Sequence, residues 1–132
     1  MNPNKKVLIT VLAFVLAMLV IACSCSSLIP ASTSKEAVPG LAGTWQDPDT
    51  NDQFVIAWQN NQYVVTSVAW EGTSYSIVSQ SWDGSSLTWS YTDTDLNLTV
   101  THSTSSVSGD NLYGNWSYSD GNSGTETLTR VK

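Results

Sequence analysis

The stretch "QFVIAWQNNQYVVTSVAWEGTS", residues 53–74, decides the fold class, because its large apolar residues recur at every second position and turn residues interrupt it. Phe54, Ile56 and Trp58 alternate with smaller residues, as they do along a strand that buries one face. The segments "QNNQ" at 59–62 and "EGTS" at 71–74 are typical of hairpin turns. The stretch therefore predicts antiparallel strands joined by short loops.

The same pattern continues through residues 41–132, which are rich in the Thr, Ser, Trp, Tyr and Val that favour strands. Short loops between successive strands favour pairing of sequence neighbours, and closing such a meander into a barrel removes its two unpaired edges. We therefore expect an all-β domain, an eight-stranded antiparallel up-and-down meander closed into a small barrel. Its strands would be separated by seven turns: "DPDTND" (47–52), "QNNQ", "EGTS", "DGSS" (83–86), "TDTD" (92–95), "SGDN" (108–111) and "SDGNSG" (119–124).

The N-terminus has the layout of a secretory signal, with Lys5 and Lys6 followed by an apolar run at 7–22 and then a cysteine. An uncleaved membrane-spanning helix is the alternative, but that usually needs about 18 to 20 apolar residues. The end of the run, "VIAC", resembles the bacterial lipobox, in which the cysteine receives diacylglycerol before cleavage. The resemblance implies a signal segment at 1–22, lipidation of Cys23, and a lipid-anchored, extracytoplasmic location in the bacterial cell envelope.

Residues 23–40 follow as a flexible linker, because "SCSSLIPASTSKEAVPG" is rich in Ser and Ala and holds two prolines. Cys25 lacks the bulky apolar residue expected three positions earlier, so it is either a bystander or a second acylation target. No cysteine follows it, which predicts a domain at 41–132 without disulfides or thiolate metal ligands.

The charge of the chain excludes one class of partner. After cleavage before Cys23, three basic residues would face eleven carboxylates, a net charge of −8. Such a chain repels phosphate backbones, so we expect no nucleic-acid partner. The lipid, rather than a basic patch, would hold it to the membrane, since two acyl chains suffice for stable attachment.

The segment "LAGTW", residues 41–45, carries a second resemblance, because Gly43 and Trp45 match the Gly-x-Trp signature of lipocalins, fatty-acid-binding proteins and avidins. The resemblance implies an up-and-down barrel whose closed end is plugged by the Trp, with Arg130 of the last strand packed across it. Such a cation–π contact is worth roughly 0.5 to 2 kcal/mol. Asp47 and Asn51 replace the Asn and Ser of biotin binders, so biotin is not expected. Bacterial metalloprotease inhibitors open similarly, but their cysteine pair is missing.

Motifs for catalysis or metal binding are weak. His102 is the only histidine, and no Gly-x-Ser-x-Gly pattern accompanies it. The segments at 47–51 and 93–97 carry carboxylates at calcium-loop spacing, but neither has the Gly and Glu that complete such a loop. Asp and Asn are also common in hairpin turns. We expect no enzyme activity, no metal and no cofactor.

Six tryptophans and five tyrosines allow two interpretations. They either line a cavity that binds a ligand, or fill the narrow interior of a small barrel. The first predicts a lipid-anchored binding module for a small apolar or sugar-like molecule. The second predicts a solidly packed barrel that acts in protein–protein interaction or protease inhibition at the envelope. The candidate ligand-binding residues are Trp58, Tyr63, Tyr75, Trp89, Tyr91, His102 and Trp116.

Overall fold

The structure is a computed structural model, and it describes residues 35–132. The predicted signal segment at 1–22, the lipidation site Cys23, Cys25 and the first part of the linker lie outside the described residues. The part of the chain that the structure describes contains no helix long and apolar enough to cross a bilayer.

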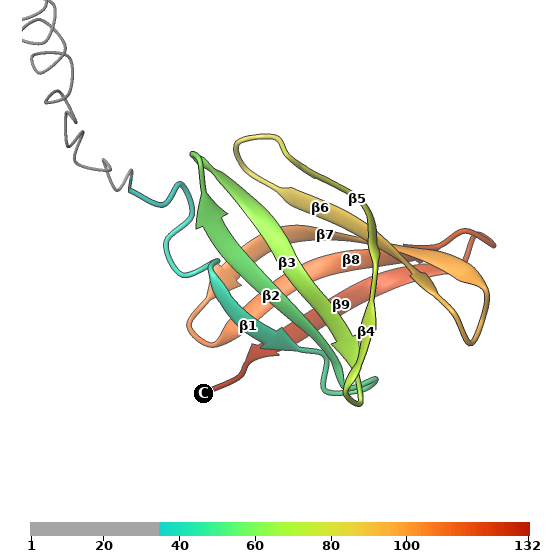
Figure 1. Ribbon diagram of the computed structural model, residues 1–132. Helices are drawn as coiled ribbons and strands as arrows, with labels where there is room; N and C mark the ends of the chain where they lie inside the picture. The colour runs from blue at the N-terminus through green and yellow to red at the C-terminus, as the bar shows by residue number, and fades with distance from the viewer. Residues whose placement is uncertain (1–34) are drawn as a thin grey trace, which may run out of the picture. The chain divides into compact units, whose positions relative to one another are not determined.

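The described chain forms one antiparallel sheet in the order β4-β3-β2-β1-β9-β8-β7-β6-β5, rolled into a nearly closed barrel (Figure 1). Consecutive strands pair with each other except β4 and β5, and β1 also pairs with β9. The all-β, up-and-down architecture is therefore confirmed. The strands are β1 (Gly43–Gln46), β2 (Asp52–Gln59), β3 (Gln62–Trp70), β4 (Thr73–Tyr75), β5 (Ile77–Trp82), β6 (Leu87–Asp93), β7 (Leu98–Ser108), β8 (Asn111–Tyr118) and β9 (Ser123–Arg130).

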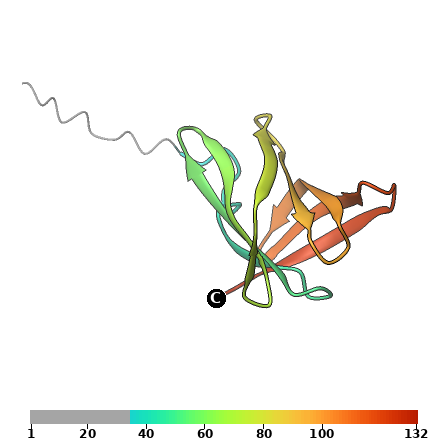
Figure 2. The ribbon, with the colours of Figure 1, turned by 45° about the vertical axis from the view of Figure 1, so that its right-hand side comes forward.

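The predicted count of eight strands is wrong, because the segment expected to be one strand after the "EGTS" turn is divided into β4 and β5. Before the division Tyr75 pairs with Val68 of β3, and after it Ile77 pairs with Tyr91 of β6. The segment thus changes partner within two residues as it crosses between the two halves of the barrel (Figure 2).

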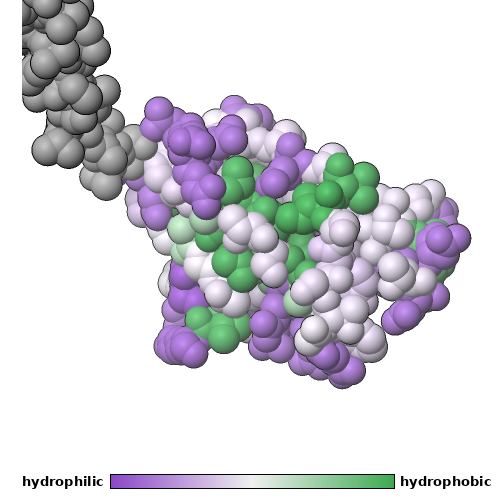
Figure 3. Space-filling view, viewed as in Figure 1, coloured by the Kyte–Doolittle hydropathy of each residue, from purple (hydrophilic) through white to green (hydrophobic). Residues whose placement is uncertain are grey.

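This change of partner leaves a seam between β3 and β5, which are not neighbours in the sheet of the described residues. A side chain bridges the seam, since the Val65 amide donates to Oε1 of Gln80 at 2.7 Å. Apolar surface gathers over β3 and β5 on this face (Figure 3). Val78 of β5 is 61% exposed. The seam is therefore the least completely paired part of the barrel wall.

One end of the barrel is closed by a packed core. Trp45 is fully buried, and its indole Nε1 donates to the Leu41 carbonyl at 2.9 Å. Arg130 lies with Cζ 4.2 Å from the Trp45 ring centroid, the packing that the Gly-x-Trp resemblance implied. The guanidinium also donates to the carbonyls of Ala42, at 3.0 Å, and of Gly40.

Gly43 is required at this end for two reasons. Its φ of +150° is one that residues with a side chain rarely adopt, and a Cβ there would lie 2.1 Å from an Arg130 guanidinium nitrogen. The glycine of the Gly-x-Trp pattern thus makes the space through which Arg130 reaches Trp45.

The chain ahead of β1 also contributes to the closed end. Val38, which lies within the predicted linker, packs against the core. The Tyr63 hydroxyl donates to its carbonyl at 2.5 Å and accepts from its amide at 3.2 Å. Trp58 and Trp82 pack around the same tyrosine, with ring centroids 4.6 and 5.0 Å away. The packing therefore begins a few residues before the first strand.

Candidate functional site

The other end of the barrel is open and holds a cavity of about 450 Å³. The loop between β1 and β2, with the first residue of β2, forms one side of the cavity, and β6 to β9 form the rest. The residues that line it are Asp47, Pro48, Asp49, Thr50, Asp52, Tyr91, Val100, His102, Trp116, Tyr118, Thr125, Glu126 and Thr127.

Aromatic rings form much of the cavity wall. Trp116 and Tyr118 alternate inward along β8, and their rings meet edge to face at 5.4 Å. Trp116 is paired across the sheet with Gly124, where a Cβ would come within 2.9 Å of the indole. The glycine therefore allows the indole to lie against the backbone of β9.

A buried histidine–glutamate pair lies beside this wall. Nδ1 of His102 is 2.8 Å from Oε2 and 3.0 Å from Oε1 of Glu126. The two residues are only 5% and 9% exposed. Because burial of a charge is costly unless it is paired, the carboxylate depends on the ring nitrogen, and the ring orientation depends on the carboxylate.

Three aromatic rings and one glycine hold this pair in place. The His102 ring is nearly parallel to those of Trp89 and Tyr91, at 5.1 and 5.7 Å, and lies 4.9 Å from the ring of Phe54. Gly114 faces Glu126 across the β8–β9 ladder, and a Cβ there would lie 3.0 Å from the carboxylate. The missing side chain leaves room for Glu126.

Two buried side-chain nitrogens have no hydrogen-bond partner within residues 35–132, Nε2 of His102 and Nε1 of Trp89. A buried polar atom without a partner is uncommon and costs free energy of folding. His102 lines the cavity, whereas Trp89 belongs to the packed core. Nε2 is therefore a buried, unsatisfied polar atom of a residue that lines the cavity.

Carboxylates surround the mouth of the cavity. Asp47 accepts from the Asp49 amide at 2.8 Å, as in the turn that the sequence predicts, and Thr50 donates to Asp52 at 2.7 Å. Burial raises the pKa of the Asp52 carboxyl above its usual 3.8, although the bond from Thr50 opposes this effect. Burial also raises the pKa of Tyr91, with the charge of Asp52 adding to the effect, so that hydroxyl stays protonated.

A second hollow of about 320 Å³ adjoins the cavity and shares Thr50, Asp52, Tyr91 and Tyr118 with it. The additional residues that line this hollow are Trp70, Tyr75, Asp93, Asp95 and Leu96. Together the two hollows make the open end of the barrel a continuous aromatic and acidic surface.

Charge is separated along the barrel axis. Arg130 and Lys132 lie at the closed end, where both approach Asp110, and Lys35 lies at the start of the described chain. No other lysine or arginine occurs among the described residues. The strand ends and loops at the open end carry Asp47, Asp49, Asp52, Glu71, Asp93, Asp95 and Asp120.

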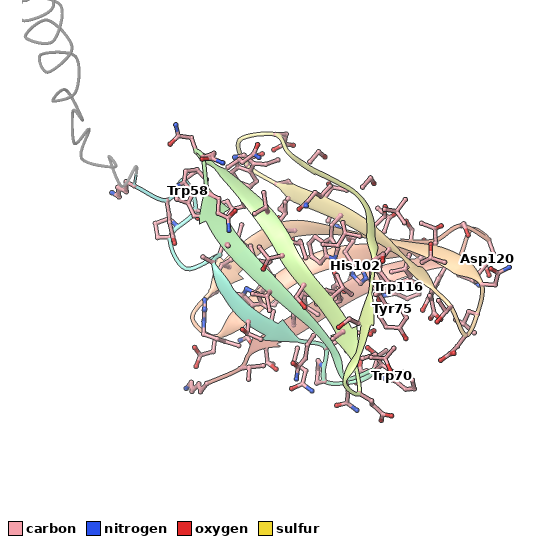
Figure 4. The ribbon with its side chains drawn as sticks, viewed as in Figure 1. Trp58, Trp70, Tyr75, His102, Trp116 and Asp120 are labelled. Carbon is pink, nitrogen blue, oxygen red and sulfur yellow. The ribbon has the colours of Figure 1, made fainter. Side chains whose placement is uncertain are left out.

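The predicted ligand-binding residues divide between the two ends of the barrel. The cavity brings together Tyr91, His102 and Trp116, and Tyr75 lines the adjoining hollow. The remaining candidates, Trp58, Tyr63 and Trp89, belong to the packed core or its edge. Figure 4 shows this division, with His102 and Trp116, which pair across β7 and β8, far from Trp58.

Sequence reasoning missed Glu126, Asp52 and Tyr118 as members of the site. Alternation along "TETLTR" places Glu126 on the same face as the buried Leu128, so an inward carboxylate could have been predicted. The partner of that carboxylate could not, because it lies 24 residues away in the chain.

Within residues 35–132, no three His, Cys, Asp or Glu side chains are arranged to hold a metal ion. Comparisons of the chain with protein-family models, with curated proteins and with solved structures found no match.

Proposed function

We propose that the chain is a lipid-anchored binding module of the bacterial cell envelope, which takes a small molecule into the open end of its barrel. The observation that carries the proposal is the cavity of about 450 Å³, in which an aromatic wall meets the buried His102–Glu126 pair. Ligand sites in proteins are typically clefts of about 300 to 1,000 Å³ with apolar walls and a few well-placed polar groups. The open end has all of these properties.

The unsatisfied Nε2 of His102 supports the same proposal. The ring is held by Glu126 and by its aromatic neighbours, so Nε2 is presented in a defined position. Such preorganisation lowers the cost of binding. That the chain is not an enzyme stays a prediction.

A packed barrel that acts on another protein remains the second candidate. The seam between β3 and β5, with the exposed Val78 beside it, supports it, because an incompletely paired strand edge can receive an extended peptide. The cavity at the open end supports the small-molecule proposal more directly.

Native mass spectrometry of the full chain, extracted gently from a bacterial host in mild detergent, tests the binding function. We expect extra mass that disappears on denaturation. Trp116→Ala should lose this mass, because it removes part of the cavity wall. Trp82→Ala is the matched control at the closed end and should keep it. A bare mass for the unaltered chain would favour the protein-interaction candidate instead.

The anchor has a separate test. Lipidation and cleavage should yield a mature chain that begins at Cys23 and carries a diacylglyceryl group, detectable by mass spectrometry of its N-terminal peptide. A chain that retains residues 1–22 without modification would contradict the lipoprotein proposal and leave the cavity proposal untouched.

A further inference from the structure

The geometry of the open end points to a class of ligand: we infer that the cavity takes a small organic cation with N–H donors, such as a primary amine on an apolar body. The inference rests on the binding function proposed above. It goes further by assigning the charge and the hydrogen-bonding character of the ligand.

The acidic groups that line the cavity are four carboxylates, which lie beside hydroxyl and indole groups that can also donate. Asp47, Asp49, Asp52 and Glu126 line it, and no lysine or arginine does so among the described residues. An ionised carboxylate can only accept hydrogen bonds, and an anionic ligand would meet repulsion from each of them. The carboxylates therefore favour a ligand that brings positive charge and donors.

A second, independent observation comes from His102. Nδ1 lies within hydrogen-bond distance of the Glu126 carboxylate, and in the neutral imidazole this contact places the ring hydrogen on Nδ1 and makes Nε2 an acceptor. This atom is buried in a residue only 5% exposed, and no described residue donates to it. A ligand N–H in the cavity would supply the missing donor.

The aromatic wall suits the same ligand. Tyr91, Trp116 and Tyr118 present ring faces and edges around the cavity, and aromatic faces attract organic cations. Burial and the nearby Asp93 and Asp52 raise the pKa of Tyr118, so its ring remains a neutral phenol. The apolar body of the ligand would lie against these rings.

The separation of charge along the barrel completes the argument. Acidic residues ring the open end, whereas Arg130 and Lys132 lie at the closed end and are engaged by Asp110. A mouth lined by one sign of charge raises the local concentration of oppositely charged molecules. The field of the barrel therefore directs cations to the cavity.

Three ligands that share one ring test the inference. Binding of 2-phenylethylamine, 2-phenylethanol and phenylacetate to the full chain in nonionic detergent is measured by isothermal titration calorimetry at low salt. We expect the amine to bind at least about tenfold more tightly than the alcohol, a difference of about 1.4 kcal/mol. The acid should bind most weakly, and among the three ligands only the amine should lose affinity when salt is added.

The N–H requirement is tested with the trimethylated form of the same amine, which keeps the charge but cannot donate. We expect weaker binding of this quaternary form. Equal binding of the two cations would overturn the role assigned to Nε2 of His102.

A matched pair of variants locates the effect. Asp52→Asn removes one charge at the mouth and should weaken binding of the amine about five- to tenfold. Asp110→Asn removes one charge at the closed end and should leave the affinity for the amine unchanged. Circular dichroism confirms that both variants fold. Equal losses in the two variants would overturn the assignment to the cavity.

These binding measurements also distinguish a failure of the cation inference from a failure of the proposed binding function. Tighter binding of the alcohol or the acid than of the amine would overturn the cation inference but support a binding cavity. Absence of binding by all of these molecules would overturn the cation inference, and the proposed function would then be decided by the native mass measurement.

Discussion

The buried pair of His102 and Glu126 offers the most demanding test of the structure. We consider three variants: His102→Phe, which keeps a ring between the aromatic neighbours; Glu126→Leu, which keeps a side chain of similar size; and the double variant. Each single change leaves the other partner buried and without its hydrogen bond, whereas the double change removes both polar groups.

The expected magnitudes follow from the burial of the two side chains, which are 6% and 3% exposed. His102→Phe leaves a buried carboxylate unpaired, which costs about 3 to 5 kcal/mol. Glu126→Leu leaves a neutral imidazole with an unpaired donor, which costs about 1 to 3 kcal/mol. The double variant should be close to neutral, since apolar replacement of a whole buried pair often is. The two changes should therefore be strongly non-additive.

Urea unfolding of the full chain at pH 7, followed by tryptophan fluorescence, measures these differences. All six tryptophans lie between positions 45 and 116, so the signal reports on the barrel. With a urea dependence of about 1.5 kcal/mol per M, the His102→Phe midpoint should fall by about 2 M or more.

Two results would refute this reasoning. A loss below about 1 kcal/mol for His102→Phe would mean that the Glu126 carboxylate reaches water in the variant. A double variant as unstable as the sum of the single variants would mean that the two side chains contribute independently, and that their contact does not organise the site.

Three further predictions concern other parts of the barrel. Gly43→Ala should destabilise the protein by about 2 kcal/mol or more, because its Cβ meets Arg130 at 2.1 Å and its φ of +150° is unfavourable; a thermal midpoint equal to that of the unaltered chain would contradict this. Asp52→Asn should raise the free energy of unfolding at pH 7, because burial raises the pKa of Asp52 in the folded state and its ionisation there opposes folding. The gain should vanish near pH 3, where the carboxyl is protonated in both states, and a gain that persists in acid urea titrations would disprove the cause. Tyr63→Phe should cost about 0.5 to 1.5 kcal/mol through loss of the hydrogen bonds to Val38, and faster hydrogen exchange at the Val38 amide is the readout; unchanged exchange would show that the hydroxyl does not hold this segment.

The hairpins were predictable because their causes are local. Alternation of Phe54 and Ile56 along β2 marks an inward face, and both side chains are buried. Asn60 and Asn61 both have positive φ, 51° and 63°, which suits a tight two-residue turn. Turn chemistry and a period of two residues act within a few positions, so they can be read from the chain directly.

The extra strand was not predictable in this way. Ser76 is neither a glycine nor a proline, and nothing in its immediate sequence marks a break between β4 and β5. The break arises because the segment must pair with β3 at its start and with β6 at its end. This change of partner is required because the barrel closes, and no local sequence pattern indicates it.

The residues of the candidate site also differ in how far the sequence could predict them. Residue type and alternation alone identified Tyr91, His102 and Trp116 as candidates for a ligand site, and all three line the cavity. The same reasoning could not separate them from Tyr63 or Trp89, which lie in the packed core. An inward aromatic side chain looks the same in sequence at either end of a strand.

The register between strands far apart in sequence separates the residues of the cavity from those of the core. It also brings together the polar groups of the site. It sets Glu126 opposite Gly114, whose missing side chain leaves room for a carboxylate that reaches His102 on β7. The chain encodes the strands and the turns through contacts between near neighbours in sequence. Which end is filled, and which is left as an acidic, aromatic cavity, depends on contacts between residues far apart in sequence, and these exist only once the barrel has closed.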